Sequence, residues 1–352
     1  MAVSVCGIYP LERRRSMFVQ SREFLVVNPL PATLSQYQKE IVGTFERLNG
    51  DKLVGLYLES GDGNPGTLAK IRSAIRILIG RAVAIPKRNA STIIVLWPLF
   101  GYFDVITWML AARRSRIICV VHDPLPLRRQ IGHSKFAKLL FAKIVESCGI
   151  LTVCHTELAG QVVRDETGVE HVLAGHPIAY DSTPLPTERA HSRDIRVMGQ
   201  YKTARTVDPL IQIAESERIR NFRLEIYGRN WPVVTGWDVK PQFIPEEQFE
   251  ELIQTSNCVV VPYSRFFQSG VAVRCLESSV PIVAPRHEHI VELFGPDWPG
   301  IVHDEDDWVD AVLRVQAIDF TRYQALRENV RRVSDDSWAK LIAGHGAKSV
   351  LR

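Results

Sequence analysis

The sequence predicts an α/β protein with two doubly wound domains that face each other across a cleft. Short apolar runs alternate with helical patterns along nearly the whole chain, and the runs are almost continuously apolar, which is typical of parallel strands covered on both faces. The chain has 352 residues, enough for two cores of about 150 residues each. A polar segment at 178–193 contains Pro184 and Pro186, lacks an apolar period and is predicted to be the linker.

The first domain is predicted over residues 21–177, after a loose N-terminal segment at 1–20. Apolar runs predict its strands at 24–28, 53–59, 93–98, 117–123, 150–156 and 171–175. Helical patterns between these runs predict helices near 35–49, 66–82, 102–112, 134–147 and 157–166. This regular alternation makes a parallel sheet the expected arrangement.

The second domain is predicted over 194–334 and repeats the alternation. Its strands are expected at 195–199, 222–228, 239–244, 258–263, 281–284 and 301–303. Its helices are expected near 206–218, 246–254, 270–278, 288–294, 306–317 and 321–333. A C-terminal helix within 335–352, around Trp338, is expected to pack back on the first domain. Because ligands of such sheets bind beyond the carboxyl ends of the strands, the site is expected in the cleft.

Positive charge is concentrated in the first half of the chain. Residues 1–180 contain 22 Lys and Arg against 14 Asp and Glu, a net charge of +8, although the whole chain carries only +4. The arginines form local clusters at 13–15, 113–116 and 128–129 and recur at 72, 76 and 81. These clusters fit either contact with an anionic membrane surface or ordinary solvated faces. They lack interleaved aromatic residues and any nucleic-acid-binding motif, so nucleic acid is not an expected partner.

Cysteine usage and targeting signals predict a cytoplasmic protein, with peripheral association at the inner face of the cell membrane as a further possibility. The six cysteines show no CxxC spacing, and several lie in apolar runs, as reduced core cysteines do. No signal peptide is visible at the N-terminus. The apolar span 91–112 is interrupted by Pro98, Gly101 and Asp104, which favours a strand, a turn and a helix over a transmembrane segment.

A basic turn follows the first strand of the second domain. That strand reaches Gly199, and Lys202 and Arg205 follow before a helical pattern begins. A helix start already favours anions, and these side chains add a point charge and a planar fork that could bind a diphosphate. Two solvated loop cations are the alternative interpretation.

A second motif follows a buried strand of the same domain. Ser269 and Gly270 open a helix, and Glu277 lies two turns inside it. Backbone N–H groups at a helix start suit a phosphate or a sugar oxygen, and a carboxylate can bind the vicinal hydroxyls of a ribose. Glu277 could equally be a surface glutamate. Arg229 and Ile244 close two other strands, where a nucleotide base could be held, although this signal is weak.

Polar residues also end strands of the first domain. His122 and Asp123 follow the run IICVV, and a histidine there could donate to a sugar hydroxyl or act as an acid or base, or could be structural. Asp123 could serve the acceptor or cap the next segment. Asn28 is a candidate for acceptor contact, although Asn-Pro also starts turns. His176, before Pro177, fits an extended turn better than a domain-crossing contact.

Taken together, these features resemble the GT-B glycosyltransferases, in particular the retaining family-4 type, over nearly the whole chain and most strongly over 195–293. Family members carry a strand, a glycine and basic residues, as in MGQYKTARTVDPLI, and a histidine-bearing strand that VVHD resembles. Their motif with two glutamates eight apart matches QSGVAVRCLESSVPIVAP, with Ser269 in place of the first glutamate and Glu277 in place of the second. The glycine-rich loop that often follows the first strand is replaced by NPLPATLSQYQ.

The resemblance implies two Rossmann-like domains and transfer of a sugar from a UDP- or GDP-sugar to a hydroxyl of a glycan or lipid-linked acceptor, as in polysaccharide or glycolipid biosynthesis. His122 would contact the donor sugar, Glu277 the ribose, and the basic turn the diphosphate. Because the cations would stabilise the leaving group, no metal or other cofactor is expected. Two alternatives stay open: a nucleotide-sugar epimerase or hydrolase of the same fold, and a non-catalytic nucleotide- or glycan-binding subunit, which the absent first glutamate favours.

Overall fold

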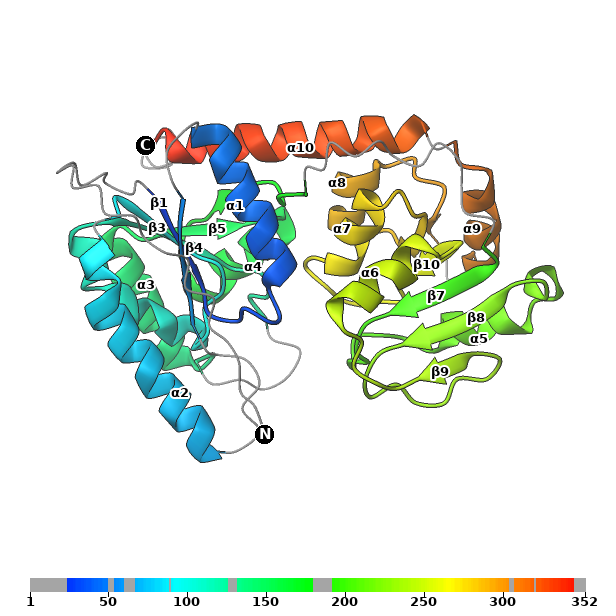
Figure 1. Cartoon of the computed structure of the whole chain (residues 1–352), viewed down its shortest axis with the longest axis horizontal. Coiled ribbons are helices and arrows are strands. Elements are labelled where there is room, and N and C mark those ends of the chain that lie inside the picture. The colour runs from blue at the N-terminus through cyan, green and yellow to red at the C-terminus, as the bar shows by residue number, and fades with distance from the viewer. Residues whose placement is uncertain are drawn as a thin grey trace, which may run out of the picture.

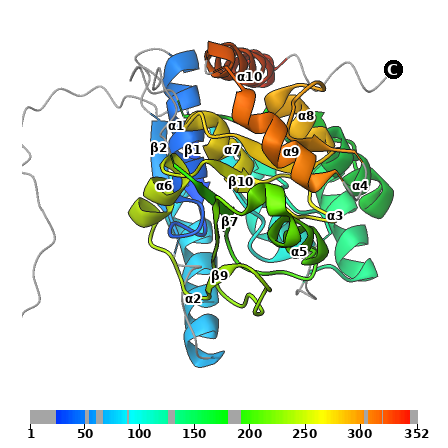
Figure 2. The ribbon, with the colours of Figure 1, turned by 90° about the vertical axis from the view of Figure 1, so that its right-hand side faces the viewer.

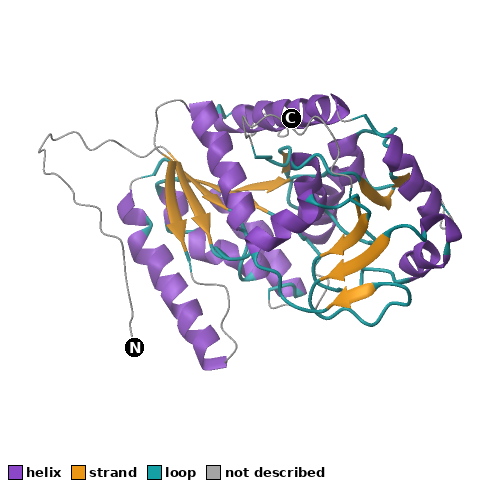
Figure 3. Cartoon of the chain, turned by 45° about the vertical axis from the view of Figure 1, so that its right-hand side comes forward, coloured by secondary structure: helices purple, strands orange, loops and turns teal. Residues whose placement is uncertain are grey.

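The computed structural model shows two α/β units, each built around a six-stranded sheet (Figure 1). It describes residues 24–49, 54–59, 67–88, 90–125, 132–179, 192–303, 307–319 and 321–344. The predicted loose segment at 1–20 and most of the predicted linker lie outside these residues. All strand pairs within the two sheets are parallel, and helices lie on both sides of each sheet (Figure 3). The predicted fold class is therefore confirmed.

The first sheet has the strand order β2-β1-β3-β4-β5-β6. Its strands are β1 (Phe24–Asn28), β2 (Val54–Leu58), β3 (Thr92–Val95), β4 (Arg116–Val120), β5 (Leu151–Cys154) and β6 (Val172–Leu173). In its centre Val26 lies opposite Leu56 on one side and Ile94 on the other. The inner strands are continuously apolar because helices cover both faces and leave neither face to water.

Helices and turns of the first unit cover this sheet. They are α1 (Ser35–Asn49), α2 (Thr67–Ile79), the π-helical turn η1 (Gly80–Ala84), the 3-10 turns η2 (Pro86–Arg88), η3 (Gly101–Trp108) and η4 (Ala111–Arg113), α3 (Lys135–Cys148) and α4 (Glu157–Thr167). On one face Phe45 of α1 packs in a cluster with Val26. On the other face Trp108 of η3 and Phe141 of α3 pack in a cluster with Leu25. Successive residues of β1 thus point into two separate cores, as the pleat of a strand requires.

The helix predicted near 102–112 is present as two 3-10 helices, η3 and η4, a form that the sequence pattern did not specify. The Thr107 hydroxyl donates to the Asp104 carbonyl at 2.7 Å and occupies an acceptor of the helical ladder. The Asp104 carboxylate pairs with Arg81 at 2.9 Å and accepts a hydrogen bond from the Trp108 indole at 2.9 Å. These side-chain bonds stabilise a tighter turn, which an apolar pattern alone does not reveal.

The second sheet has the order β12-β11-β10-β7-β8-β9. Its strands are β7 (Asp194–Met198), β8 (Arg223–Tyr227), β9 (Asp238–Lys240), β10 (Cys258–Val260), β11 (Ile282–Pro285) and β12 (Ile301–Val302). Its helices and turns are α5 (Asp208–Glu215), η5 (Glu217–Ile219), α6 (Glu246–Gln254), α7 (Gly270–Glu277), α8 (Glu288–Phe294), α9 (Trp308–Arg314) and η6 (Val315–Ala317). β7 lies between β10 and β8 and is wholly buried. The carboxyl end of β7 therefore lies among the ends of the central strands and not at an outer strand.

The last helix, α10 (Thr321–Ile342), runs from the second unit to the first along one side of the molecule (Figures 1 and 2). Tyr323 packs in the core of the second unit, whereas Trp338 and Leu341 pack in that of the first. The Trp338 indole also donates to the Gly175 carbonyl at 3.1 Å. The predicted boundary at 334 therefore falls inside one continuous helix, which has neither proline nor glycine to interrupt it.

Two further features bear on the sequence predictions. Ile178, predicted to start the linker, is buried in the core of the second unit, so the chain has already crossed between the units there. None of the helices that the structure describes is long and apolar enough to cross a membrane.

Candidate functional site

The carboxyl ends of the two sheets meet at the boundary between the units. The side chain of Gln268, just before α7, contacts Nδ1 of His122, just after β4. Its neighbour Phe267 packs in an apolar cluster of the first unit that includes Val121 and Val163. The loop before α7 therefore reaches across the boundary at the predicted site.

Gly199 ends β7 with a φ of +94°, a conformation that glycine adopts readily and other residues rarely do. Its carbonyl accepts hydrogen bonds from the Trp231 indole at 2.8 Å and from Nη1 of Arg205 at 3.1 Å. Gly228, which ends β8, comes so close that a Cβ there would lie 2.1 Å from the Gly199 carbonyl oxygen. Both strand ends therefore require glycine for this close backbone approach.

The guanidinium of Arg205 is buried behind this turn, and only 4% of the residue is exposed. Nη2 donates to the Met198 carbonyl at 2.8 Å and to the Tyr263 hydroxyl at 2.6 Å, and the Tyr263 ring lies 4.6 Å away. Nε is buried without a partner, and within the described residues no carboxylate pairs with this arginine. Burying a charge without an opposite charge is unfavourable. Arg205 thus supports the turn and leaves an unbalanced positive charge beside it.

Lys202, the other cation of the basic turn, is exposed and lies near Asp123 of the first unit. Burial raises the pKa of Asp123, whereas the positive charges of Lys202 and Arg265 lower it. The structure therefore brings a predicted donor residue and a predicted acceptor residue together across the boundary. The two cations of the turn differ in setting, because one is internal and the other faces solvent.

Ser269 is the N-cap of α7, as its position before the helical pattern predicts. Its hydroxyl accepts a hydrogen bond from the backbone N–H of Ala272 at 3.3 Å. The space around exposed Gly270 is open, since a Cβ there would meet no atom within 4 Å. The hydroxyl is occupied by the cap, so the backbone amides are the groups at this helix start that suit an anion.

His122 uses both of its ring nitrogens. Nε2 donates to the Leu96 carbonyl at 2.9 Å, which leaves Nδ1 as an acceptor for the Gln268 amide. The Trp97 ring stacks on it at 5.2 Å, and the Tyr37 ring lies edge-on at 4.6 Å. Burial lowers the pKa of His122 to about 3, so the ring is neutral near pH 7. Donation to a sugar hydroxyl, one of the expected roles, is not open to it in this arrangement, and Nδ1 is reachable only if Gln268 moves.

Glu277 ends α7 at the boundary, where protein groups already contact its carboxyl group. One oxygen accepts from the Ala179 backbone N–H at 2.5 Å, and the group hydrogen-bonds with the carboxyl of Glu40 in α1. Burial raises the pKa of both groups, and the proximity of Glu277 raises that of Glu40 further. Adjacent buried carboxyls favour a shared proton over two charges. The ribose contact expected of Glu277 stays a prediction.

Three further histidines surround this boundary. The ring of His155 lies 5.4 Å from that of His122 and 4.9 Å from that of His176, and His176 lies 6.1 Å from His289 of α8. The Tyr37 hydroxyl bonds Nε2 of His155 at 2.8 Å. His176 therefore makes the domain-crossing contact that the sequence pattern ranked below an extended turn. We call these four histidines the boundary histidines.

The other predicted residues lie at the edges of the site. The Asn28 amide donates to the Gln38 side chain at 2.8 Å, and its oxygen accepts from the Leu30 N–H at 2.9 Å, as in a turn. Arg229 is exposed, with its guanidinium 5.4 Å from the Phe243 ring. Ile244 is buried in the core of the second unit, so its side chain is not presented to a ligand.

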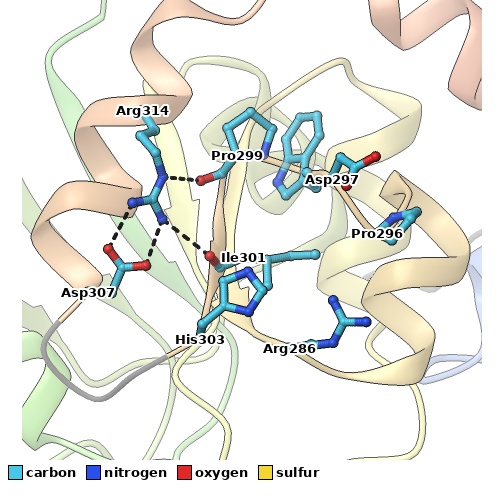
Figure 4. A pocket seen from close by; sticks show the side chains of 9 residues that line it. Arg286, Pro296, Asp297, Pro299, Ile301, His303, Asp307 and Arg314 are labelled. Carbon is cyan, nitrogen blue, oxygen red and sulfur yellow. Dashed lines mark hydrogen bonds and ion pairs between the residues drawn. The ribbon is translucent and has the colours of Figure 1, made fainter.

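A pocket of about 500 Å³ lies near the ends of β11 and β12 (Figure 4). Arg286 and His303, which directly follow these strands, line it. Arg314 also lines it but is already paired with Asp307 through two hydrogen bonds of 2.8 Å. With that charge balanced, the pocket is a weaker diphosphate candidate than the turn at Gly199.

Sequence reasoning missed several residues of the boundary. Gln268 directly precedes the recognised Ser269, and this adjacency was the available signal. Tyr37 and Glu40 are three residues apart and so share a helix face, but their partners come from distant segments that no local pattern predicts. In the part of the chain that the structure describes, no group of three or more His, Cys, Asp or Glu residues is arranged to hold a metal ion.

No family model and no curated protein matches the chain. Several solved structures, however, have a similar fold. A sucrose-phosphate synthase from Thermosynechococcus elongatus superposes with a TM-score of 0.62 at 12% identity, over 92% of this chain and 97% of its own. A UDP-forming α,α-trehalose-phosphate synthase from Burkholderia xenovorans, in complex with glucose-6-phosphate, gives 0.57 at 13% identity, over 92% and 98%. An E. coli trehalose-6-phosphate protein bound with UDP-2-fluoro glucose gives 0.61 at 11%, over 94% and 100%.

These similarities extend over both units. At such low identity they establish the fold, which is the GT-B arrangement of two Rossmann-like domains facing each other. The assignment to family 4 stays a prediction.

Proposed function

We propose that this protein is a glycosyltransferase that moves a sugar from a nucleotide-diphospho-sugar to a hydroxyl of a glycan or lipid-linked acceptor. The observation that carries the proposal is the buried, unbalanced charge of Arg205 behind the Gly199 turn, with Lys202 exposed nearby. A leaving diphosphate is an anion, and the positive charges of Arg205 and Lys202 at the Gly199 turn would attract it. Support comes from two similar structures, one named as UDP-forming and the other bound with UDP-2-fluoro glucose.

The proposed mechanism stabilises charge on the leaving group. As the glycosidic bond breaks, negative charge builds on the diphosphate, and groups that bind it more tightly then accelerate the step. Lys202 and the amides at the start of α7 would contact it, while Arg205 holds the turn and adds its positive field. This scheme assigns charge stabilisation to protein groups and does not need a metal.

The acceptor would approach from the first unit. Asp123 follows β4 and lies near Lys202, and its raised pKa makes it a better base toward an acceptor hydroxyl than an ordinary aspartate. Neutral His122 would then position the donor sugar through Nδ1, once Gln268 moves away from this nitrogen. A cytoplasmic location is part of this proposal, and its support is the cysteine pattern of the sequence, in which several cysteines lie in apolar runs as reduced core cysteines do.

A thermal-shift panel of UDP, GDP and their sugars tests this function. A ligand that binds only the folded state at 100 times its Kd stabilises by about 2.7 kcal/mol, so at least one diphosphate should raise the midpoint. Lys202→Ala should reduce that rise and lower turnover by about 2–4 kcal/mol of transition-state stabilisation. Lys340→Ala, an exposed lysine of α10, is the matched control and should change neither. If no diphosphate shifts the wild-type midpoint, the proposal fails.

A second candidate is a non-catalytic nucleotide- or glycan-binding subunit. Ser269 stands where the resembled family has a glutamate, and the Glu277 carboxyl is engaged by Ala179 and Glu40. Such a subunit would bind diphosphates but consume no nucleotide sugar with any acceptor, and His122→Ala would leave binding unchanged. Nucleotide release that His122→Ala abolishes would exclude this candidate.

A further inference from the structure

Helix α2 lies on the side of the first unit away from the second unit (Figure 1), and it and its neighbours carry exposed apolar side chains. We call this surface the outer face and define it by nine exposed side chains of α2, η1, η3, α3 and the segment after η3. They are Ile75, Leu78, Ile79, Val83, Ile106, Met109, Leu110, Phe136 and Leu139. The elements that carry them adjoin one another, because η3 contacts both η1 and α3. Soluble monomers rarely expose large contiguous apolar patches unless they bind something.

Positive charge predominates in the stretch of sequence that forms the outer face, although Lys138 of α3 pairs with Glu166 of α4. From Thr67 to Val145 the sequence has 14 Lys and Arg but only two acidic residues, Asp104 and Asp123. Asp104 is buried in its ion pair with Arg81, and Asp123 lies at the boundary between the units. No exposed carboxylate therefore interrupts this stretch in the part that the structure describes.

Apolar and basic side chains alternate on this surface. On α2, Ile75 and Ile79 are one turn apart, and exposed Arg72 and Arg76 are one turn apart beside them. Leu110 is likewise 57% exposed, close in sequence to two exposed arginines. Helices with aliphatic side chains beside Lys and Arg are typical of elements that lie in the plane of a membrane interface.

We propose that the outer face docks on an anionic lipid bilayer, with its aliphatic side chains among the headgroups and its cations on lipid phosphates. An anionic bilayer fits this surface, because it presents phosphates to the arginines and an apolar layer to the aliphatic side chains. A pocket of about 560 Å³ at the edge of the outer face is lined by Ile85, Ile93 and Leu110, with Arg113 and Arg114 in its wall. It combines apolar lining and positive charge, as binding of an anionic lipid requires.

Vesicle flotation of the whole chain, without nucleotide, tests this docking. The protein should float with vesicles of phosphatidylcholine and phosphatidylglycerol, should not float with phosphatidylcholine alone, and should be released by high salt, which screens the cations. Each basic residue near such a surface contributes about fivefold to partitioning. Arg113→Glu with Arg114→Glu should therefore weaken flotation by at least about 20-fold, and Ile79→Asp with Leu110→Asp should abolish it.

Matched controls lie on the second unit. Val233→Asp alters a side chain that is 93% exposed, and Arg220→Glu reverses an exposed arginine, so both should float like the wild type. Flotation of the outer-face variants equal to the wild type would overturn the proposal, as would binding to duplex DNA with no binding to vesicles. Docking does not rest on the proposed function. Flotation tests the docking, and the nucleotide-induced thermal shift tests the function in a separate measurement. A protein that shows the shift but does not float refutes only the docking.

Discussion

At the scale of single residues, Arg205 connects the fold with the proposed chemistry. In the sequence it is one of two cations after Gly199, but in the structure it is internal and donates to the Met198 and Gly199 carbonyls. These partners are neutral, so its charge is available to an anion that reaches the turn. Lys202 supplies the exposed contact. Arg205 therefore shapes the turn, and Lys202 is the residue that would contact the ligand.

Gly199→Ala should disrupt this turn. A Cβ at this position would lie 2.9 Å from Nη2 of Arg205, and the backbone has a φ of +94°, so we expect a loss of about 1–3 kcal/mol in the free energy of unfolding. Urea denaturation measures this loss. Gly43→Ala is the matched control, because Gly43 lies inside α1 with only the Arg47 side chain nearby, at 3.6 Å. It should stabilise by about 0.5–1 kcal/mol. Equal effects of the two changes would contradict the account.

At the scale of elements, one buried arginine organises the turns of the first unit. Arg81 of η1 makes two 2.8 Å bonds to Glu59, which follows β2, and a 2.9 Å bond to Asp104 of η3. Its guanidinium also lies 4.5 Å from the Trp108 ring. The opposing carboxylates raise the pKa of Arg81, against the effect of burial. The outer face is held on the sheet partly through this network.

Arg81→Met should therefore be strongly destabilising. It would leave Glu59 and Asp104 buried without a counter-charge, and breaking a buried pair in this way costs about 3–5 kcal/mol. The loss should appear as a lower urea midpoint. Arg164→Met provides the control, because the Arg164–Glu170 pair of 2.7 Å is largely exposed, and exposed pairs contribute about 0–1 kcal/mol. A loss below about 1 kcal/mol for Arg81→Met would show that the network is not stabilising in this sense.

Most strands of both sheets could be predicted, because buried parallel strands have short, almost continuously apolar sequences. The N-cap at Ser269 and the turn at Gly199 were also predictable, since both depend on local backbone chemistry. The form of η3 was not, because side-chain bonds to Asp104 decide it. The continuity of α10 was missed because both halves look like separate helices when their tertiary partners are unknown.

At the scale of the whole molecule, the two units are held together by buried polar groups as well as by α10. The four boundary histidines come from both units, and the shared hydrogen bond between Glu40 and Glu277 also crosses the boundary. The Glu288 carboxylate of α8 accepts from the first two N–H groups of α4, at 2.6 and 2.8 Å. Local patterns could not reveal this interface, since each contact joins distant parts of the chain.

The boundary histidines should destabilise the fold as the pH drops from about 6.5 toward 4. Burial lowers the pKa of His155 to about 4 and those of His122 and His289 to about 3, and it lowers that of His176 as well. An unfolded histidine titrates near pH 6.5, so in this window the unfolded state binds more protons. Each histidine then costs up to about 1.4 kcal/mol per pH unit.

Nearby carboxyls act in the opposite direction. Glu40 and Glu277 have raised pKa values, so their contribution falls as the pH rises above about 4.5, where the unfolded carboxyls ionise. Burial also raises the pKa values of Glu59, Asp123 and Glu292, so the contribution of a histidine is isolated by comparing the wild type with a variant that lacks it. Urea unfolding at pH 7 and pH 5.5 measures the difference, and His155→Gln should flatten it. An equal pH response in the wild type and in His155→Gln would contradict a neutral, buried His155.

The crystal structure of a complex with UDP or GDP, whichever stabilises the protein, is the most direct test of the central claim. We expect the diphosphate beside the Gly199 turn, with an oxygen within hydrogen-bonding distance of Lys202 and of the amides at the start of α7. The charge of Arg205 would then have its counter-ion. A diphosphate bound elsewhere, for instance beside Arg286 in the pocket near β11 and β12, with protein side chains closing the corner at Gly270, would contradict the account.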